Sequence, residues 1–198
     1  MRIAVTGCYG SGKSSVSRLL SSYLGACLCN TDFICRELME PGEEGFVGLQ
    51  KEFGERFITR DGQLDRLLLR EVVLTDTVVK TQLEAIVHPL VRKSVGELAE
   101  QSAGLNLFLV VEVPLLFEVG WQEDFDVTVL VRVANETCVN RVIARDEIDR
   151  EEAQRIINQQ LPMSCKEPLA DYIIDNGSTF VSTAQQTAWL ATLLANTK

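Results

Sequence analysis

The sequence lacks a long hydrophobic run and an export signal. Its longest nearly apolar stretch is "LNLFLVVEVPLLF", residues 105–117, which Glu112 and Pro114 interrupt. This stretch is shorter than the roughly 20 residues that a membrane-spanning helix needs. The first residues form a strand-like segment, without the basic region and apolar segment of an export signal. We therefore expect a cytoplasmic protein with no membrane partner.

Paired cysteines of the metal-binding kind are also lacking, because none of the six cysteines belongs to a C-x-x-C unit. Disulfides are rare in the reducing compartment expected here. Cys27 and Cys29 alternate in "GACLCN", which predicts that they share one face of a strand. We expect six free thiols, with Cys27 and Cys29 as small core residues.

The chain has no excess of positive charge. It carries 19 lysines and arginines against 28 acidic residues, a net charge of −9. An acidic protein repels a phosphate backbone, so nucleic acid is not an expected partner. A small anionic ligand would have to be met by local cations, which makes each lysine or arginine near a glycine-rich loop a candidate.

The pattern of apolar residues predicts one α/β domain over residues 1–198. Residues 2–5, 26–30, 126–133 and 170–176 read as strands, and another strand opens the run at 107. Continuous apolar strands indicate a parallel sheet covered by helices on both faces. Residues 41–104 show helical spacing and no clear strand, so we predict a core of about 1–40 and 105–198 with a helical insertion. Pro89 should kink or restart a helix within that insertion.

The stretch "TGCYGSGKSS" follows the first predicted strand and precedes a predicted helix over 13–24. Gly7-x-x-x-x-Gly12-Lys13-Ser14 fits the phosphate-binding loop pattern. Glycines let backbone N–H groups turn toward phosphate oxygens, and the helix N-terminus adds partial positive charge. Lys13 would reach the outer phosphates, and the Ser14 hydroxyl could bind Mg²⁺. The expected nucleotide-binding residues of the loop are Gly10, Ser11, Gly12, Lys13, Ser14 and Ser15.

Two other nucleotide sites fit this loop less well. A dinucleotide site would use Gly-x-Gly and an acid such as Asp32 about 20 residues on, but the third small residue is missing. GTPases combine the loop with Asp-x-x-Gly and Asn-Lys-x-Asp motifs, and neither occurs in this sequence. The classes of protein that still fit the loop are small-molecule kinases and ATP-driven machines.

The chain resembles the dephospho-CoA kinase family nearly from end to end. The matching segments are "VTGCYGSGKSSVS", "NTDFICREL", "LDRLLLREVV", "LEAIVHPLVR", "VVEVPLLFEVG", "NRVIARD", "INQQLP" and "LADYIIDNG". The resemblance implies a three-layer P-loop NTPase fold with a parallel sheet, a helical substrate-binding insertion and a mobile lid at about 141–155. It also implies ATP and Mg²⁺ as cofactors and phosphorylation of the ribose 3′-hydroxyl of dephospho-CoA.

Several residues after the second strand are candidates for the acceptor side of this reaction. Asp32 matches the family's second-motif aspartate and could accept the hydroxyl proton, or it could cap the helix that begins near Phe33. Arg36 lies one turn further on the same face and could hold a substrate phosphate or pair with an acid. Arg66 and His88 are further substrate-binding candidates, although a histidine before proline is usually structural.

Residues nearer the C-terminus are candidates for the nucleotide side. Arg141 and Arg145 are four positions apart on one helix face, ahead of the acidic stretch "DEIDREE", and a lid could carry them onto the phosphates. Arg141 is the preferred catalytic arginine and Arg145 a nucleotide ligand; an exposed helix face is the plainer reading. Asn176 could approach the adenine or simply form a turn.

Some residues depart from the family pattern. Asn30 and Glu112 stand where the family usually has aspartate, and Cys8 and Tyr9 replace small and aliphatic residues. Glu112 would still direct a carboxylate at Mg²⁺. Two other functions stay open: a kinase of another small hydroxyl substrate, and a nucleotide-binding regulator with weak catalysis. We expect a monomer or a small homo-oligomer.

Overall fold

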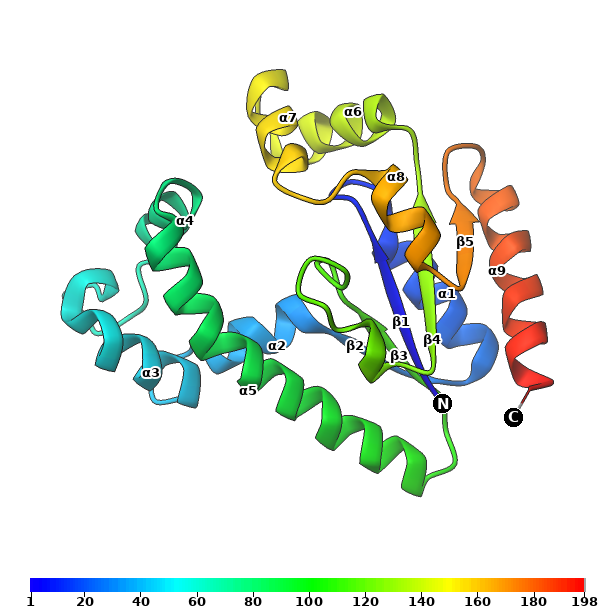
Figure 1. Ribbon diagram of the computed structural model, residues 1–198, viewed down its shortest axis with the longest axis horizontal. Coiled ribbons are helices and arrows are strands. Elements are labelled where there is room, and N and C mark those ends of the chain that lie inside the picture. Colours follow the sequence, from blue (N-terminus) through cyan, green and yellow to red (C-terminus); the bar gives the residue numbers. More distant parts are fainter. Residues whose placement is uncertain (198) are drawn as a thin grey trace. The chain divides into compact units, whose positions relative to one another are not determined.

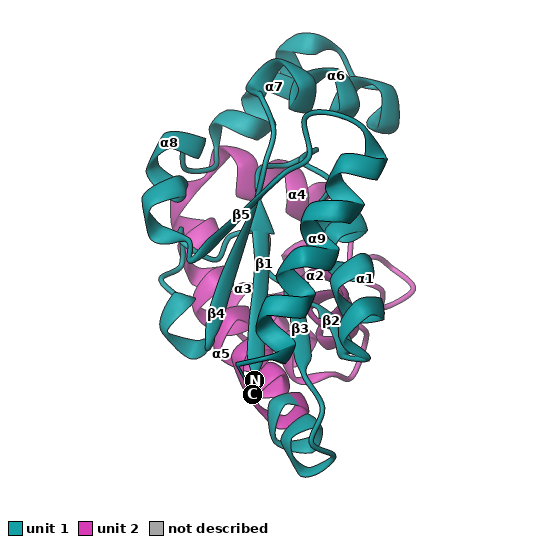
Figure 2. Cartoon of the chain, turned by 90° about the vertical axis from the view of Figure 1, so that its right-hand side faces the viewer, with its two compact units in different colours: residues 1–30, 99–198 teal, residues 31–98 magenta. Residues whose placement is uncertain are grey.

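The computed structural model describes residues 1–197, which form two compact units. The first unit comprises residues 1–30 and the chain from residue 99 onward, and the second comprises residues 31–98 (Figure 2). The second unit therefore begins ten residues before residue 41, the expected start of the insertion. It ends six residues before residue 104, the expected end.

The first unit is built on a five-stranded sheet with the order β2-β3-β1-β4-β5, in which every neighbouring pair is parallel (Figure 1). The predicted parallel α/β sheet is therefore confirmed. Its strands are β1 (Arg2–Gly7), β2 (Cys27–Asn30), β3 (Leu109–Glu112), β4 (Val127–Arg132) and β5 (Tyr172–Asp175).

Two helices cover one face of this sheet. Helix α1 (Lys13–Leu24) and helix α9 (Phe180–Ala195) lie on the same side, and α8 (Met163–Lys166) lies on the other (Figures 1 and 2). Buried side chains of β1, β3 and β4 meet those of α1 and α9 in one core, whose members include Ile3, Val5, Val16, Leu20, Val110, Val129, Leu190 and Leu194. The central strands are apolar on both faces because both faces are covered.

Helices α6 (Asn135–Asp146) and α7 (Arg150–Asn158) follow β4. The helical conformation is interrupted between them, as the charged run predicts. Glu147 has φ 55°, and Asp149 caps α7 by accepting a hydrogen bond from the Glu152 N–H. These helices share a small core with the glycine loop. Its buried members are Cys8, Val133, Cys138, Val139, Val142, Ala153 and Ile157. The remaining short elements of this unit are 3₁₀ turns at Gln122–Asp124 and Glu167–Leu169.

The second unit is helical. It contains α2 (Thr31–Leu38), α3 (Glu44–Phe53), a 3₁₀ turn (Gly54–Phe57), α4 (Arg66–Thr75) and most of α5 (Thr77–Gly104). Helices α3 and α5 approach closely, because a Cβ on Gly48 would lie 2.7 Å from the Ile86 side chain. Phe53 and Phe57 pack edge to face with ring centroids 5.3 Å apart. As expected, this stretch holds no strand and only an isolated bridge between Ile58 and Leu64.

The expected restart at Pro89 is wrong, because α5 continues through it. Proline removes one N–H from the helix and so costs one hydrogen bond to the preceding turn. A buried apolar stripe runs along α5 on both sides of Pro89, and its packing offsets that loss; it consists of Val79, Val87, Val91 and Val95.

The described residues bear on the expected free thiols and on membrane-spanning helices. All six cysteines are free thiols, with Cys29 buried and Cys27 only half-buried at its edge strand. Within residues 1–197, no helix combines the length and hydropathy needed to cross a bilayer.

Candidate active site at the glycine loop

The glycine loop leaves the carboxyl end of the central strand β1 and enters α1. Gly10 and Gly12 have φ of 83° and 87°, in the left-handed region that favours glycine. Both also lie where no side chain fits. A Cβ on Gly10 would be 2.8 Å from the Cys138 carbonyl, and one on Gly12 would collide with the Asn176 amide. The glycines therefore serve both the turn and its close packing.

Lys13 is buried, and its ammonium group lies inside the loop. Its Nζ donates to the Gly7 carbonyl at 3.2 Å and to the Cys8 carbonyl at 3.0 Å. The loop also closes on itself through the Ser11 N–H, which donates to the Cys8 carbonyl at 3.0 Å. A full positive charge is thus held at the start of α1, whose N-terminal partial charge adds to it.

Ser14 and Glu112 form the second polar feature of the site. The Ser14 hydroxyl donates to Glu112 Oε1 at 2.8 Å. Glu112 ends β3 and is paired in register with Val5 of β1 and Asn30 of β2, so the sheet itself fixes its carboxylate beside the loop. Hydroxyl and carboxylate oxygens are the ligands that Mg²⁺ prefers, and the pair fits that ion.

Arg141 and Asn176 meet at the Ser11 carbonyl. Arg141 donates to it at 3.4 Å and to the Asn176 carbonyl at 3.0 Å, while the Asn176 amide donates to it at 2.7 Å. Thr183 on α9 fixes the other end of that amide by donating to its oxygen at 2.8 Å. Two of the candidates from the C-terminal half therefore contact the loop directly.

Arg145 is held differently. Its guanidinium forms two hydrogen bonds with Asp146, at 2.7 and 2.9 Å, and lies 4.5 Å from the centre of the Tyr9 ring. The Tyr9 hydroxyl donates to the same carboxylate at 3.0 Å. The hydrogen bonds that Arg145 donates to Asp146 raise the pKa of Arg145; burial opposes this shift, and the charges of Tyr9 and Asp146 add to it. Tyr9, one of the residues unusual for the family, thus ties the loop to the end of α6.

Gln160 has no assigned role in the sequence analysis, although it lies in the quoted segment "INQQLP". Its side-chain oxygen accepts a hydrogen bond from the Tyr9 N–H at 2.7 Å, and its amide nitrogen donates to the Pro114 carbonyl at 3.4 Å. The only sequence signal for Gln160 was its place in a matched segment.

A buried ion pair, which no sequence pattern predicts, lies between Lys166 and Glu118. Lys166 is fully buried, and its Nζ lies 2.6 Å from Glu118 Oε1. That oxygen also accepts a hydrogen bond from the Leu161 N–H at 3.0 Å. The pair joins α8 to the segment after β3.

Cys8 of the glycine loop and Cys138 of α6 are both buried, and their thiols form a hydrogen bond. The hydrogen bond with Cys138 lowers the pKa of the Cys8 thiol to about 7; burial opposes the shift, and the charges of Lys13 and Lys166 support it. The pKa of Cys138 is raised, first by the same hydrogen bond and then by burial.

The acceptor-side candidates belong to the second unit. Asp32 lies in the first turn of α2, which begins at Thr31, two residues before the start expected near Phe33. Arg66 pairs with Glu40 at 2.8 Å and donates to the Arg36 carbonyl at 3.3 Å. His88 is half-buried on α5, and burial lowers its pKa.

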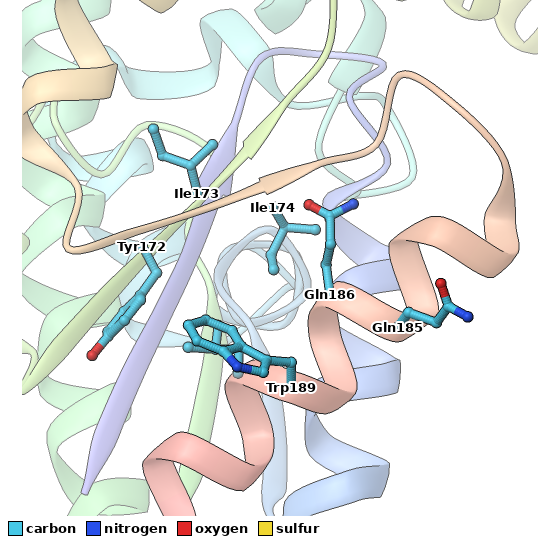
Figure 3. A pocket seen from close by; sticks show the side chains of 7 residues that line it. Tyr172, Ile173, Ile174, Gln185, Gln186 and Trp189 are labelled. Atoms are coloured by element: carbon cyan, nitrogen blue, oxygen red, sulfur yellow. The ribbon is translucent and has the colours of Figure 1, made fainter.

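A separate groove of about 370 Å³ lies between β5 and α9. Figure 3 shows Tyr172, Ile173 and Ile174 of β5 and Trp189 of α9 along it. Its lining carries no charged side chain, so it does not supply what a nucleotide's phosphates require.

Comparisons with known proteins agree with the glycine loop and the sheet. The family model of dephospho-CoA kinase matches residues 1–181. The chain belongs to the dephospho-CoA kinase family. It is 38% identical over 186 residues to the dephospho-CoA kinase of Desulfotalea psychrophila, with 94% of each chain covered.

Solved structures resemble the whole chain of this family member. A protein from Thermus thermophilus has a TM-score of 0.83 at 32% identity, covering 100% of this chain and 98% of the other. The dephospho-CoA kinase of Campylobacter jejuni has a TM-score of 0.73 at 24% identity, covering 98% and 97%. The predicted family and the predicted P-loop kinase fold are confirmed.

Proposed function

We propose that this member of the dephospho-CoA kinase family transfers the γ-phosphoryl group of ATP to the ribose 3′-hydroxyl of dephospho-CoA. The observation that carries the proposal is the glycine loop with Lys13 buried inside it and Ser14 bonded to Glu112 at its end. Phosphoryl transfer depends on positioning and on stabilising negative charge. The loop supplies backbone N–H groups, a helix N-terminus and one ammonium for that purpose.

The roles of the loop residues follow from their contacts. Gly10, Ser11 and Gly12 shape the phosphate cradle, and Ser14 and Ser15 continue it into α1. Lys13 exchanges its two carbonyl partners for phosphate oxygens when nucleotide binds, since charged oxygens are the stronger acceptors. Lys13 thereby stabilises charge that develops during transfer.

Mg²⁺ would be held by the Ser14 hydroxyl and the Glu112 carboxylate. Among described residues no cluster of three acidic, histidine or cysteine side chains could hold a metal, so phosphate and water would complete the ligand set. When bound, the ion supplies neutralisation of phosphate charge. The longer reach of glutamate compared with aspartate suits the hydroxyl contact that Glu112 already makes.

Arginines and Asn176 serve the nucleotide side of the reaction. Arg141 would leave the Ser11 carbonyl and stabilise the transferring phosphoryl group, as a lid residue of 141–155. Asn176 and Arg145 would contact ATP after giving up their present partners.

The acceptor side uses residues of the second unit. Asp32 accepts the proton of the 3′-hydroxyl, with its charge favoured by the first turn of α2. Arg36, Arg66 and His88 bind dephospho-CoA; the Arg66–Glu40 pair is exposed and costs little to break.

An assay of ADP release with and without dephospho-CoA tests this function. ATP and Mg²⁺ are supplied, and a panel of nucleosides and small hydroxy acids serves as the comparison. We expect ADP release that depends on dephospho-CoA and a product phosphorylated at the 3′-position. Turnover of another acceptor with dephospho-CoA inert would indicate a different kinase, and ATP binding without turnover would indicate a regulator.

A further inference from the structure

Gln160 connects three segments that serve the phosphate site. Its backbone N–H donates to the Ile157 carbonyl at 3.1 Å, which fixes it to the last turn of α7. Its side chain bonds the Tyr9 N–H in the glycine loop and the Pro114 carbonyl two residues after Glu112. One amide therefore links α7, the loop and the segment that carries the Glu112 carboxylate.

The two partners require a side chain that can both accept and donate a hydrogen bond, as the Gln160 amide does. The Tyr9 N–H needs an acceptor, and the Pro114 carbonyl needs a donor. A glutamate could not donate, a lysine could not accept, and a methionine could do neither. The two bonds also fix which end of the amide faces which partner.

The contact lies where the loop must keep its shape. The Tyr9 N–H is held from outside the loop by Gln160, and Cys8 and Tyr9 pack in the same core as α6 and α7. Movement at the end of α7 therefore acts on the backbone of the loop. It also acts on the spacing between the loop and the strand end bearing Glu112, on which the Ser14–Glu112 contact depends.

From this linkage we infer that Gln160 is a positioning residue for the ATP phosphates: it holds the outer side of the glycine loop and its distance from β3. The inference rests on the proposed ATP-dependent function. Its effect is on ATP and not on the phosphate acceptor, because none of its three contacts involves the second unit.

The test compares Gln160→Met, Gln160→Asn and the control Gln159→Met. Methionine keeps the volume but forms neither bond, and asparagine keeps the amide but is too short to reach both partners. Gln159 is the exposed neighbour at the end of the same helix. Activity assays give KM and kcat for each substrate. Hydrogen exchange of the peptide containing Tyr9 measures how well the Tyr9 N–H is protected.

We expect both Gln160 variants to raise the KM for ATP by roughly 10-fold, because each leaves a partly buried N–H and a partly buried carbonyl without their partners. The KM for dephospho-CoA should stay within about twofold of wild type on the same reasoning. Exchange at Tyr9 should accelerate in Gln160→Met, and Gln159→Met should match the wild type in every readout.

A purely structural role would lower the folded fraction, and hence kcat, while leaving the KM for ATP unchanged. An unchanged KM for ATP, or unchanged exchange at Tyr9 in Gln160→Met, would overturn the inference. If Gln160→Met fails to fold, Gln160→Asn decides by the same KM comparison. Wild-type enzyme inactive with ATP and dephospho-CoA would instead refute the proposed function.

Discussion

The Ser14 hydroxyl donates a 2.8 Å hydrogen bond to the Glu112 carboxylate, across the gap between the start of α1 and the end of β3. The register of the parallel sheet sets this relationship, since Glu112 pairs with Val5 two residues before the loop begins. This hydrogen bond joins the two residues that would hold Mg²⁺.

Removing the charge of Glu112 should weaken the binding of Mg²⁺. Glu112→Gln keeps the shape and removes the charge, so the Mg²⁺ concentration for half-maximal activity should rise about 10-fold or more. Glu112→Asp, the residue usual in the family, should retain activation near the wild-type concentration. A titration of activity with Mg²⁺ measures both. Equal activation curves for wild type and Glu112→Gln would show that this carboxylate does not serve the metal.

Removing the Lys13 ammonium should depress turnover. Lys13→Ala loses charge stabilisation that acts mainly in the transition state, so kcat should fall by roughly 100-fold or more. ADP release measures the rate, and circular dichroism checks that the variant is folded. Lys51→Ala, a change at an exposed lysine of α3, is the matched control. Near-normal turnover in Lys13→Ala would remove the ammonium from the mechanism.

Asp32→Asn separates a catalytic carboxylate from a structural one. Loss of the proton acceptor should lower kcat by about 100-fold while ATP affinity stays unchanged. ATP binding measured by calorimetry, together with kcat, gives both values. Glu37→Gln removes an exposed carboxylate of the same helix and should leave both unaltered. Full turnover in Asp32→Asn would exclude this group as the base.

The Cys8 thiol should make stability depend on pH. Folding lowers its pKa from 9.0 to about 7, so the thiolate's contribution is complete above pH 9 and is lost as pH falls through 7. The free energy of unfolding of wild type minus that of Cys8→Ser should therefore increase between these two pH values. Chemical denaturation across this range measures it, with the exposed Cys165→Ser as control. A difference that does not vary with pH would contradict the lowered pKa.

The buried pair of Lys166 and Glu118 can be tested by removing one partner and then both. Lys166→Met leaves a largely buried carboxylate unpaired, so the free energy of unfolding should fall by about 3–5 kcal/mol. The double variant Lys166→Met with Glu118→Leu should recover most of this loss, because no buried charge remains. Denaturant unfolding measures all three proteins. A double variant as unstable as the single one would mean that the methionine packs badly and that the charge is not the cause.

Much of the fold could be predicted from local patterns. The apolar run "RIAV", the glycine loop and the charged break near residue 147 each carry their signal within a few residues, and the structure agrees with each. Of the two outcomes predicted at Pro89, a kink or a restart, the restart does not occur, because α5 continues through the proline. Cys27 was expected in the core, and its position on an edge strand leaves it half-buried.

The candidate site also contains some residues that local sequence patterns identify and others that they do not. Lys13 and Ser14 could be identified from spacing alone, since loop and helix place them. Gln160 and Tyr9 could not, because the value of Gln160 lies in a bond across 151 residues of chain. The hydrogen bond from Asn176 to Ser11 crosses 165 residues, and no local pattern encodes it.

The sequence by itself determined the parallel α/β class, the phosphate loop and the family, because these depend on short-range periodicity, backbone freedom at glycine and the order of motifs. Only the tertiary structure decided which side chains hold the loop, which thiols pair and which charge is buried. Those outcomes depend on distances between segments remote in sequence, and packing of the whole sheet and its helices sets such distances.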